Sequence, residues 1–207
     1  KIAISRPPET ILQSAYICYD IQKLHILEDL FAKSRPQRVI IFSSSKLKVK
    51  ELAFAIKRMK FNVAAMHSDL EQAKREEVMK DFKNGRIDIL VATDIVARGI
   101  DIDDIKLVIN FDIPHDPEDY VHRIGRTARG TNGEGLAITF VAEHEQAQFS
   151  RIEKFLEKPI YKIPVPAEFG ETPAYEPEKH PEGRGFRRPG GGDKGRTGHG
   201  GGNRQGG

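Results

Sequence analysis

From residue 15 to residue 156 the chain alternates between short apolar runs and longer stretches in which apolar residues recur every three or four positions. The short runs are rich in β-branched residues and predict buried strands, whereas the helical spacing predicts amphipathic helices. The expected strands are 15–19, 38–42, 62–66, 87–92, 106–111 and 136–141. The expected helices are 21–32, 46–59, 71–83, 117–124 and 143–156. Apolar strands that alternate with helices predict an α/β fold, in which helices cover both faces of a parallel sheet.

The two ends of the chain lack this pattern. Residues 1–14 contain two adjacent prolines and predict an extended lead-in, so the folded domain is expected at 15–158. Prolines interrupt 159–182, which predicts a linker. Residues 183–207 are rich in Gly and Arg and have few apolar groups to bury, so we expect them to be disordered. The composition thus predicts one domain followed by a tail.

Composition narrows the class of protein. Cys18 is the only cysteine, so the sequence offers no internal disulfide and no cysteine cluster for zinc, and a reducing, cytoplasmic setting fits it best. No apolar run approaches the roughly 20 residues of a membrane helix, so no membrane partner is expected. The first residue is Lys1 rather than Met, which suggests that something precedes it. The formal net charge of +3 is too small to indicate nucleic acid by itself, so the placement of charge must carry that argument.

Three arginines recur at every third position near an expected helix. Arg123, Arg126 and Arg129 would lie along one side of a helical turn, with Gly125 loosening the backbone between them. An arginine side chain presents a planar set of donors that matches phosphate oxygens, so this row suits a polyphosphate or a nucleic-acid backbone. For the spacing alone, solvated surface arginines are the alternative.

Polar residues also follow the expected strand 87–92. Thr93, Asp94, Gly99 and Asp101 come after it, at the carboxyl end of a strand, which is where ligands bind in parallel sheets. Either aspartate by itself could instead cap a helix or stabilise a loop.

Two more polar segments precede expected helices. Ser45 follows a strand and could cap the next helix. Ser68 or Asp69 could cap 71–83, whose amino end would present free N–H groups and positive potential to an anion. Arg75 lies in the first turns of that helix, and an exposed arginine among acidic neighbours is the alternative to a binding role there.

Together these segments resemble the sequence motifs of the DEAD-box RNA helicases. Residues 122–129, HRIGRTAR, are similar to the family motif H-R-x-G-R-x-x-R. Residues 92–101, ATDIVARGID, are similar to A-T-D-x-A-x-R-G-[IL]-D, with Val96 where the family usually has alanine. QAKR at 72–75 resembles a Q-x-x-R motif, and IIFSSS at 40–45 resembles a motif that usually ends in threonine.

Two motifs that hold the nucleotide phosphates in this family are missing from the chain. The sequence contains no G-x-x-x-x-G-K-[ST] loop and no Asp-Glu-Ala-Asp string. The resemblance therefore implies the second of two RecA-like domains, with ATP and Mg²⁺ held mainly by the first, N-terminal domain. Without that domain we expect this fragment to be inactive and monomeric.

The resemblance also implies roles for individual residues, none of which binds a metal. Arg126 and Arg129 would be arginine fingers on the γ-phosphate of ATP, and Asp101 would accept a hydrogen bond from the ribose. Pure capping is the alternative for Ser45, and a structural role is the alternative for His122. The RNA-binding residues would be Thr93, Gly99, Arg75 and Ser45. The residues that couple the two domains would be His122, Arg123, Gln72 and Arg98.

These inferences combine into one predicted function. The chain would be the second half of an ATP-dependent RNA helicase, an RNA-stimulated ATPase that separates short duplexes locally. Its partners would be RNA, bound through the backbone without regard to sequence, and the N-terminal RecA-like domain of the same protein. The tail carries a net charge of +4 from residue 181 onward and could bind RNA or act as a neutral linker. The alternatives are a non-catalytic RNA-binding or regulatory module and a relative that remodels DNA.

Overall fold

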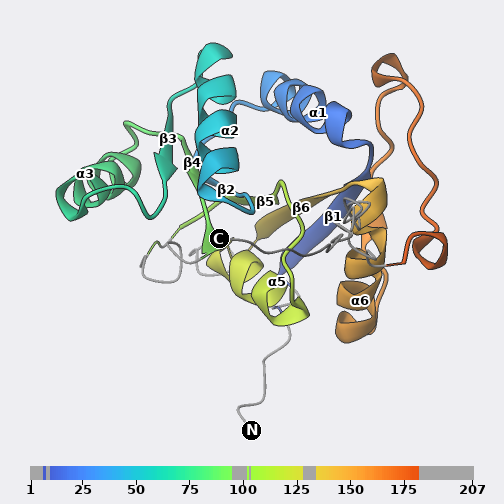
Figure 1. Ribbon diagram of the computed structural model, residues 1–207. Helices are drawn as coiled ribbons and strands as arrows, with labels where there is room; N and C mark the ends of the chain where they lie inside the picture. The colour runs from blue at the N-terminus through green and yellow to red at the C-terminus, as the bar shows by residue number, and fades with distance from the viewer. Residues whose placement is uncertain (1–6, 8–9, 95–101, 103, 128–133, 182–207) are drawn as a thin grey trace, which may run out of the picture.

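The computed structural model describes residues 7, 10–94, 102, 104–127 and 134–181. Within these ranges the chain forms a seven-stranded parallel sheet with helices on both faces, as the sequence predicts (Figure 1). The strands are β1 (Ile11–Ile17), β2 (Val39–Phe42), β3 (Val63–Met66), β4 (Ile89–Ala92), β5 (Leu107–Asn110), β6 (Gly135–Val141) and β7 (Tyr161–Lys162). The helices are α1 (Asp20–Lys33), α2 (Lys46–Arg58), α3 (Gln72–Lys83), α5 (Pro117–Ile124) and α6 (Gln146–Leu156). The 3₁₀ turns are η1 (Gly125–Thr127), η2 (Glu143–Glu145), η3 (Ala167–Phe169) and η4 (Pro177–Lys179).

The order of the strands, β3-β4-β2-β5-β6-β1-β7, determines which helix covers which face of the sheet. From β1 the chain crosses to β2 and then to β3, and the connecting helices α1 and α2 pack on one face. From β3 the chain returns in the opposite direction, and α3, α5 and α6 pack on the other face. A right-handed crossover between parallel strands requires the helix to change face when the direction reverses.

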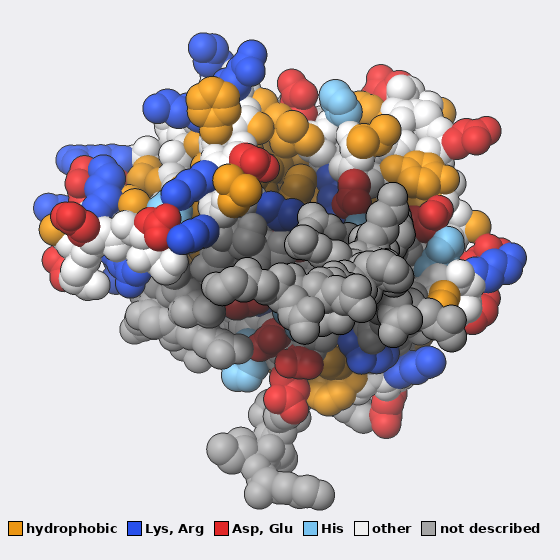
Figure 2. Space-filling view, viewed as in Figure 1, with side chains coloured by type: hydrophobic (Ala, Val, Ile, Leu, Met, Phe, Trp, Pro, Cys, Tyr) orange, Lys and Arg blue, Asp and Glu red, His pale blue; other side chains and the backbone are white. Residues whose placement is uncertain are grey.

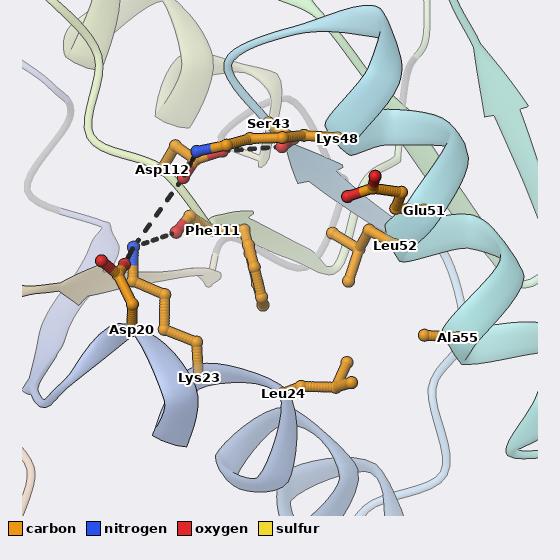
Figure 3. A pocket seen from close by; sticks show the side chains of 10 residues that line it. All are labelled: Asp20, Lys23, Leu24, Ser43, Lys48, Glu51, Leu52, Ala55, Phe111 and Asp112. Atoms are coloured by element: carbon orange, nitrogen blue, oxygen red, sulfur yellow. Dashed lines mark hydrogen bonds and ion pairs between the residues drawn. The ribbon is translucent and has the colours of Figure 1, made fainter.

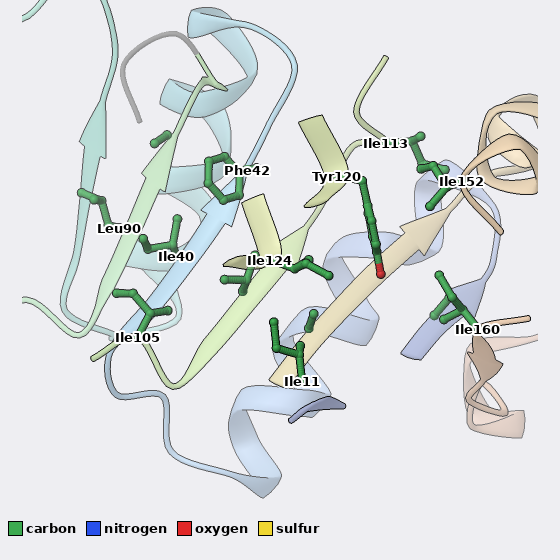
Figure 4. Packing of buried hydrophobic residues seen from close by; sticks show 14 of the residues in the cluster. Ile11, Ile40, Phe42, Leu90, Ile105, Ile113, Tyr120, Ile124, Ile152 and Ile160 are labelled. Atoms are coloured by element: carbon green, nitrogen blue, oxygen red, sulfur yellow. The ribbon is translucent and has the colours of Figure 1, made fainter. Parts of the chain in front are cut away.

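Alternate residues of the central strands enter two separate hydrophobic cores. Ile40 and Phe42 of β2 join Tyr120 and Ile124 of α5 in the core under α3, α5 and α6 (Figure 4). Ile41 points the other way and packs under α1 and α2. Because helices cover both faces, every residue of β2 and of β4 is buried.

The first strand begins four residues earlier than the sequence predicts. Ile11 is buried and pairs with Gly135, and all seven residues of β1 lie in register with β6. The polar pair Gln13 and Ser14 interrupts the apolar run, which is why the pattern indicated a start at residue 15 and a lead-in over 1–14. Tertiary pairing with β6 outweighs the local pattern here.

The proline-rich segment after α6 belongs to the folded domain. We call residues 160–181 the C-terminal strap. Its strand β7 pairs with β1, and Gln22 of α1 donates a hydrogen bond of 2.9 Å to the carbonyl oxygen of Phe169. Gln146 of α6 donates a bond of 2.9 Å to the carbonyl oxygen of Ala174. The linker expected at 159–182 is therefore corrected over its described part, because contacts with distant residues hold it rather than a local periodic pattern. Residues 183–207 lie outside the described residues.

Candidate functional site

Three adjacent strands end at one edge of the sheet, where the predicted site residues gather. Phe42 at the end of β2 lies in register with Ala92 of β4 and with Asn110 of β5. Ser43 and Thr93 are the next residues along the chain, so the polar segments meet at this carboxyl edge. Ligands bind at this edge in parallel α/β sheets.

Arg123 of α5 joins the ends of these three strands. Its Nε and Nη2 atoms donate hydrogen bonds to the two carboxylate oxygens of Asp94, each 2.5 Å long. Its Nη1 atom donates to the side-chain oxygen of Asn110 at 3.1 Å and to the carbonyl oxygen of Asp112 at 2.9 Å. The guanidinium also lies 5.0 Å from the ring centre of Phe42. A two-point Arg–carboxylate pair of this kind fixes both distance and orientation.

This geometry defines the contacts of Arg123 within its own domain. The residue is only 4% exposed, and its three guanidinium nitrogens donate bonds within its own domain. A buried charge that is paired on every side stays in place, because separation would leave uncompensated charges behind. Arg123 therefore fixes α5, the helix that leads to Arg126. The coupling of Arg123 to a partner domain stays a prediction.

Asp112, just beyond β5, collects a second set of bonds at the same edge. Its carboxylate accepts hydrogen bonds from the Ser43 hydroxyl at 2.6 Å and from the Ser44 N–H at 2.9 Å, and Lys48 of α2 lies 3.4 Å away (Figure 3). Burial alone would raise the pKa of Asp112. The bond from Ser43 and the charges of Lys23 and Lys48 outweigh that effect and hold the pKa below its usual value.

Lys23 of α1 is a buried cation that the sequence analysis missed. It is 2% exposed, and its ammonium donates to the carbonyl oxygen of Phe111 at 2.9 Å and to the carboxylate of Glu145 at 2.6 Å. Glu145 in turn accepts bonds from the N–H groups of Ile113 and Ala142. Burial alone would lower the pKa of Lys23, but the facing carboxylates, Glu145 above all, raise it. The one available signal was the position of Lys23 one turn before Leu27, on the apolar side of its helix.

A crevice of about 430 Å³ lies between α1 and α2 beside this network. Leu24, Leu52 and Phe111 form its apolar part, and Lys48 and Asp112 lie at its polar end (Figure 3). Among the described residues, none of those predicted to bind ATP or RNA lines it.

The turn η1 carries Arg126 and is held by two close contacts. The hydroxyl of the next residue, Thr127, donates a hydrogen bond of 2.7 Å to the carbonyl oxygen of Ile105. A Cβ atom on Gly135, the first residue of β6, would lie only 2.5 Å from the Thr127 methyl group, so β6 and η1 approach each other in a way that only glycine permits. Arg126 is half-buried and His122 is exposed.

Four other predicted site residues lie in the segments that follow β2, β3 and β4. Their environments differ. Ser45 caps α2, since its hydroxyl accepts a bond of 3.2 Å from the N–H of Lys48, and the capping role expected for it is confirmed. Gln72 donates to Glu76 at 3.3 Å within α3. Arg75 and Thr93 are half-buried.

The cap expected for α3 is wrong. The helix begins at Gln72 with Glu71 as its N-cap residue, and no side chain bonds the free N–H groups there. Asp69, one of the two residues expected to cap it, instead pairs with Lys46 and Lys50 of α2. The lysines compete successfully for the carboxylate because they bring opposite charge. Four predicted site residues lie outside the described residues: Arg98, Gly99, Asp101 and Arg129.

Comparisons with known proteins agree with this fold. Residues 22–131 match the family model described as "Helicase conserved C-terminal domain". The chain is 42% identical over 148 residues to the ATP-dependent RNA helicase CshA of Listeria monocytogenes, a match that covers 72% of this chain and 28% of the relative. The structure of the E. coli DEAD-box protein SrmB bound to the regulator of ribonuclease activity A superimposes with a TM-score of 0.74 at 34% identity, covering 80% of this chain and 99% of that chain.

A third relative was solved with ligands. The S. cerevisiae protein Dbp5 bound to RNA and ADP BeF3 gives a TM-score of 0.70 at 31% identity over 76% of this chain and 42% of that chain.

The sheet and the matched stretch together define a RecA-like helicase C-terminal domain. Within that class, the chain belongs to the DEAD-box helicase family and corresponds to its C-terminal domain. The chain spans about a third of the length of the curated relatives that it matches. No helix among the described residues is long and apolar enough to cross a membrane.

Proposed function

We propose that this chain is the second half of an RNA-stimulated ATPase that separates short RNA duplexes in the cytoplasm. ATP would lie between this domain and an N-terminal RecA-like domain. Arg126 and Arg129 would neutralise the charge that develops on the γ-phosphate, and Asp101 would bind the ribose. Support comes from relatives named as ATP-dependent RNA helicases and from Dbp5, solved with RNA and ADP BeF3.

One observation carries the proposal. Arg126 lies in the turn η1, three residues after Arg123. The close approach of Thr127 and Gly135 fixes this turn. A catalytic guanidinium must meet a developing charge without first having to reorganise, and a turn anchored at Thr127, next to Arg126, meets this requirement. A surface arginine would need no such support.

The pairing of the carboxylates supports the proposal that the first domain, and not this one, would hold Mg²⁺. Asp94, Asp112 and Glu145 are each held by an arginine or a lysine of this domain. Paired carboxylates of this kind are not free to coordinate Mg²⁺, so the first domain would hold the ion. When bound there, Mg²⁺ would neutralise part of the charge of the phosphates.

RNA would cross the carboxyl edge of the sheet. Thr93, Gly99, Arg75 and Ser45 would contact its phosphates, and contacts of this kind bind without reading the sequence. His122, Arg123, Gln72 and Arg98 would transmit the state of the nucleotide to the closure of the two domains. The fragment itself would be monomeric and inactive.

The test is ATP hydrolysis by this chain with RNA present, alone and after mixing with a first domain that carries the phosphate-binding loop. We expect no turnover alone and RNA-stimulated turnover on mixing, reduced roughly 10³-fold or more by Arg126→Ala. Arg58→Ala, at the exposed end of α2, is the matched control and should retain activity. Turnover by the chain alone, or full activity of Arg126→Ala, would disprove the proposal, and RNA binding without any turnover on mixing would favour a non-catalytic module.

A further inference from the structure

Two lysines of α2 hold one carboxylate at the carboxyl edge, outside the motif residues. Lys46 Nζ lies 3.1 Å from Asp69 Oδ1, and Lys50 Nζ lies 3.0 Å from Asp69 Oδ2. The lysines are one helical turn apart on the same side of α2, so each ammonium group pairs with one oxygen of the Asp69 carboxylate. All three side chains are about half exposed, at 56%, 48% and 44%.

A third cation approaches the same segment from the opposite side. Arg75 of α3 donates a bond of 3.3 Å from Nη2 to the carbonyl oxygen of Ser68, the residue before Asp69. Its Nε atom is buried and has no hydrogen-bond partner among the described residues. The segment between β3 and α3 therefore lies between the lysines of α2 and the arginine of α3.

His67 lies next to the same three cations. Its ring is buried, and Nδ1 accepts a bond of 3.3 Å from the N–H of Asp69. Burial lowers the pKa of His67, and the charges of Lys50, Lys46 and Arg75 lower it further, against the opposing effect of Asp69. Three positive charges thus act on one point with a single carboxylate against them. Figure 2 shows the Lys and Arg side chains gathered over α2 and α3, with a few carboxylates among them.

The lysine pair lies next to two residues that are proposed to bind RNA. Ser45, one of the residues proposed to touch RNA, directly precedes Lys46 and caps the same helix. Arg75, another of them, is itself one of the three cations. An RNA strand that touched both residues would run close to Lys46, which follows Ser45, and to Asp69, whose neighbour Ser68 accepts the bond from Arg75.

We propose that Lys46 and Lys50 form a phosphate clamp for the RNA backbone, in which the Asp69 carboxylate holds the two lysines in place until a phosphate group displaces it. This inference rests on the proposed function, because the ligand is the same RNA strand. A carboxylate and a phosphate diester both offer two negatively charged or partly charged oxygens to a pair of ammonium groups. An exposed lysine–carboxylate pair contributes little to stability, so exchanging one anion for the other is inexpensive.

The test measures binding of a fluorescently labelled single-stranded oligouridine to the full chain at several salt concentrations. Lys46→Gln/Lys50→Gln should bind about tenfold more weakly than the unaltered chain, with a salt dependence shallower by roughly one unit of slope. Asp69→Asn should bind up to about fivefold more tightly, because the competing anion is gone. The control Lys57→Gln lies near the far end of the same helix and should bind normally. All the altered side chains are exposed or half exposed, so thermal unfolding should be unchanged.

The outcomes separate this inference from the proposed function. If the unaltered chain binds RNA and the double variant binds equally well, the clamp is wrong and the proposed function stands. If Asp69→Asn binds more weakly, Asp69 does not compete with phosphate and the exchange is wrong. An equal loss with Lys57→Gln would mean that general charge, and not this pair, attracts RNA. If the unaltered chain does not bind RNA, the RNA part of the proposed function fails together with the clamp.

Discussion

The guanidinium of Arg123 and the carboxylate of Asp94 form a two-point ion pair with both bonds 2.5 Å long, between the helix α5 and the end of β4. The pair ties the helix that leads to the proposed finger Arg126 to the segment with the proposed RNA contact Thr93. It is therefore the natural place to begin testing the site.

Arg123→Lys should lower the free energy of unfolding by about 3–5 kcal/mol. A lysine cannot bond Asp94 at two points and also reach Asn110 and the carbonyl oxygen of Asp112, so buried polar groups would lose their partner. Urea denaturation measures the loss. Arg58→Lys, an exposed change of the same kind, should stay within about 0.5 kcal/mol of the unaltered chain. Equal stability of the two variants would show that Arg123 does not hold the strand ends together.

Asp112→Asn should remove stability that depends on pH. Because the folded-state pKa of Asp112 is depressed, its contribution is present above the ordinary pKa of 3.8 and is lost as the pH falls through the folded value. The variant should therefore be less stable than the unaltered chain at pH 7, and the difference should shrink below about pH 4. Denaturation at a series of pH values measures this. Asp116→Asn, an exposed change outside this network, is the control variant.

Gly135→Ala should destabilise the domain by about 1–3 kcal/mol, because the new Cβ atom would lie 2.5 Å from the methyl group and 2.8 Å from the carbonyl oxygen of Thr127. In the two-domain enzyme it should also lower ATP turnover, since η1 must shift and carries Arg126. Gly125→Ala is the matched control for stability, because a Cβ atom there meets nothing within 4 Å and φ is −59°. Thermal unfolding of both variants decides the matter, and equal melting temperatures would contradict the packing argument.

Glu153→Gln should loosen the C-terminal strap. The carboxylate accepts bonds from the N–H of Ile160, the ammonium of Lys162 and the hydroxyl of Tyr175. Replacing a charged acceptor by an amide should weaken these bonds by about 2 kcal/mol, which corresponds to roughly 30-fold faster hydrogen exchange of the strap amides. The amide of Ile163, bonded to Ala15 at 2.7 Å, is a suitable reporter. Glu178→Gln in the same strap should leave the exchange rate of the Ile163 amide unchanged. A similar change in both variants would contradict the special role of Glu153.

Much of the fold could be predicted because its signals are local. The helix α5 begins at Pro117 as expected, since proline suits the first turn of a helix, and the apolar run at β2 marks a strand buried on both faces. The strap could not be found in this way. Its contact between Gln22 and Phe169 joins residues 147 positions apart, and a glutamine in a helix carries no mark of a distant partner.

The sequence indicated which residues belong to the candidate site, but not how they are arranged in space. The spacing of the arginines indicated a row along one side of a helix, but α5 ends at Ile124, and Arg123 faces inward while Arg126 is half-buried. Spacing cannot reveal which carboxylate will lie opposite a given arginine after folding. The same limit applies to Lys23 and Glu145, which are brought together across 122 residues.

The short strand β7 has a consequence for how this domain behaves among its own copies. It pairs with Ser14 and Ala15, in the middle of β1, and so interrupts an outer edge that is seven residues long. A protein that ended with α6 at Leu156 would leave that edge bare, with the exposed side chain of Leu12 beside it. Bare edges of this kind are templates for pairing between molecules. We therefore expect the strap to hinder such pairing, so that a shortened chain would lose solubility before it lost its fold.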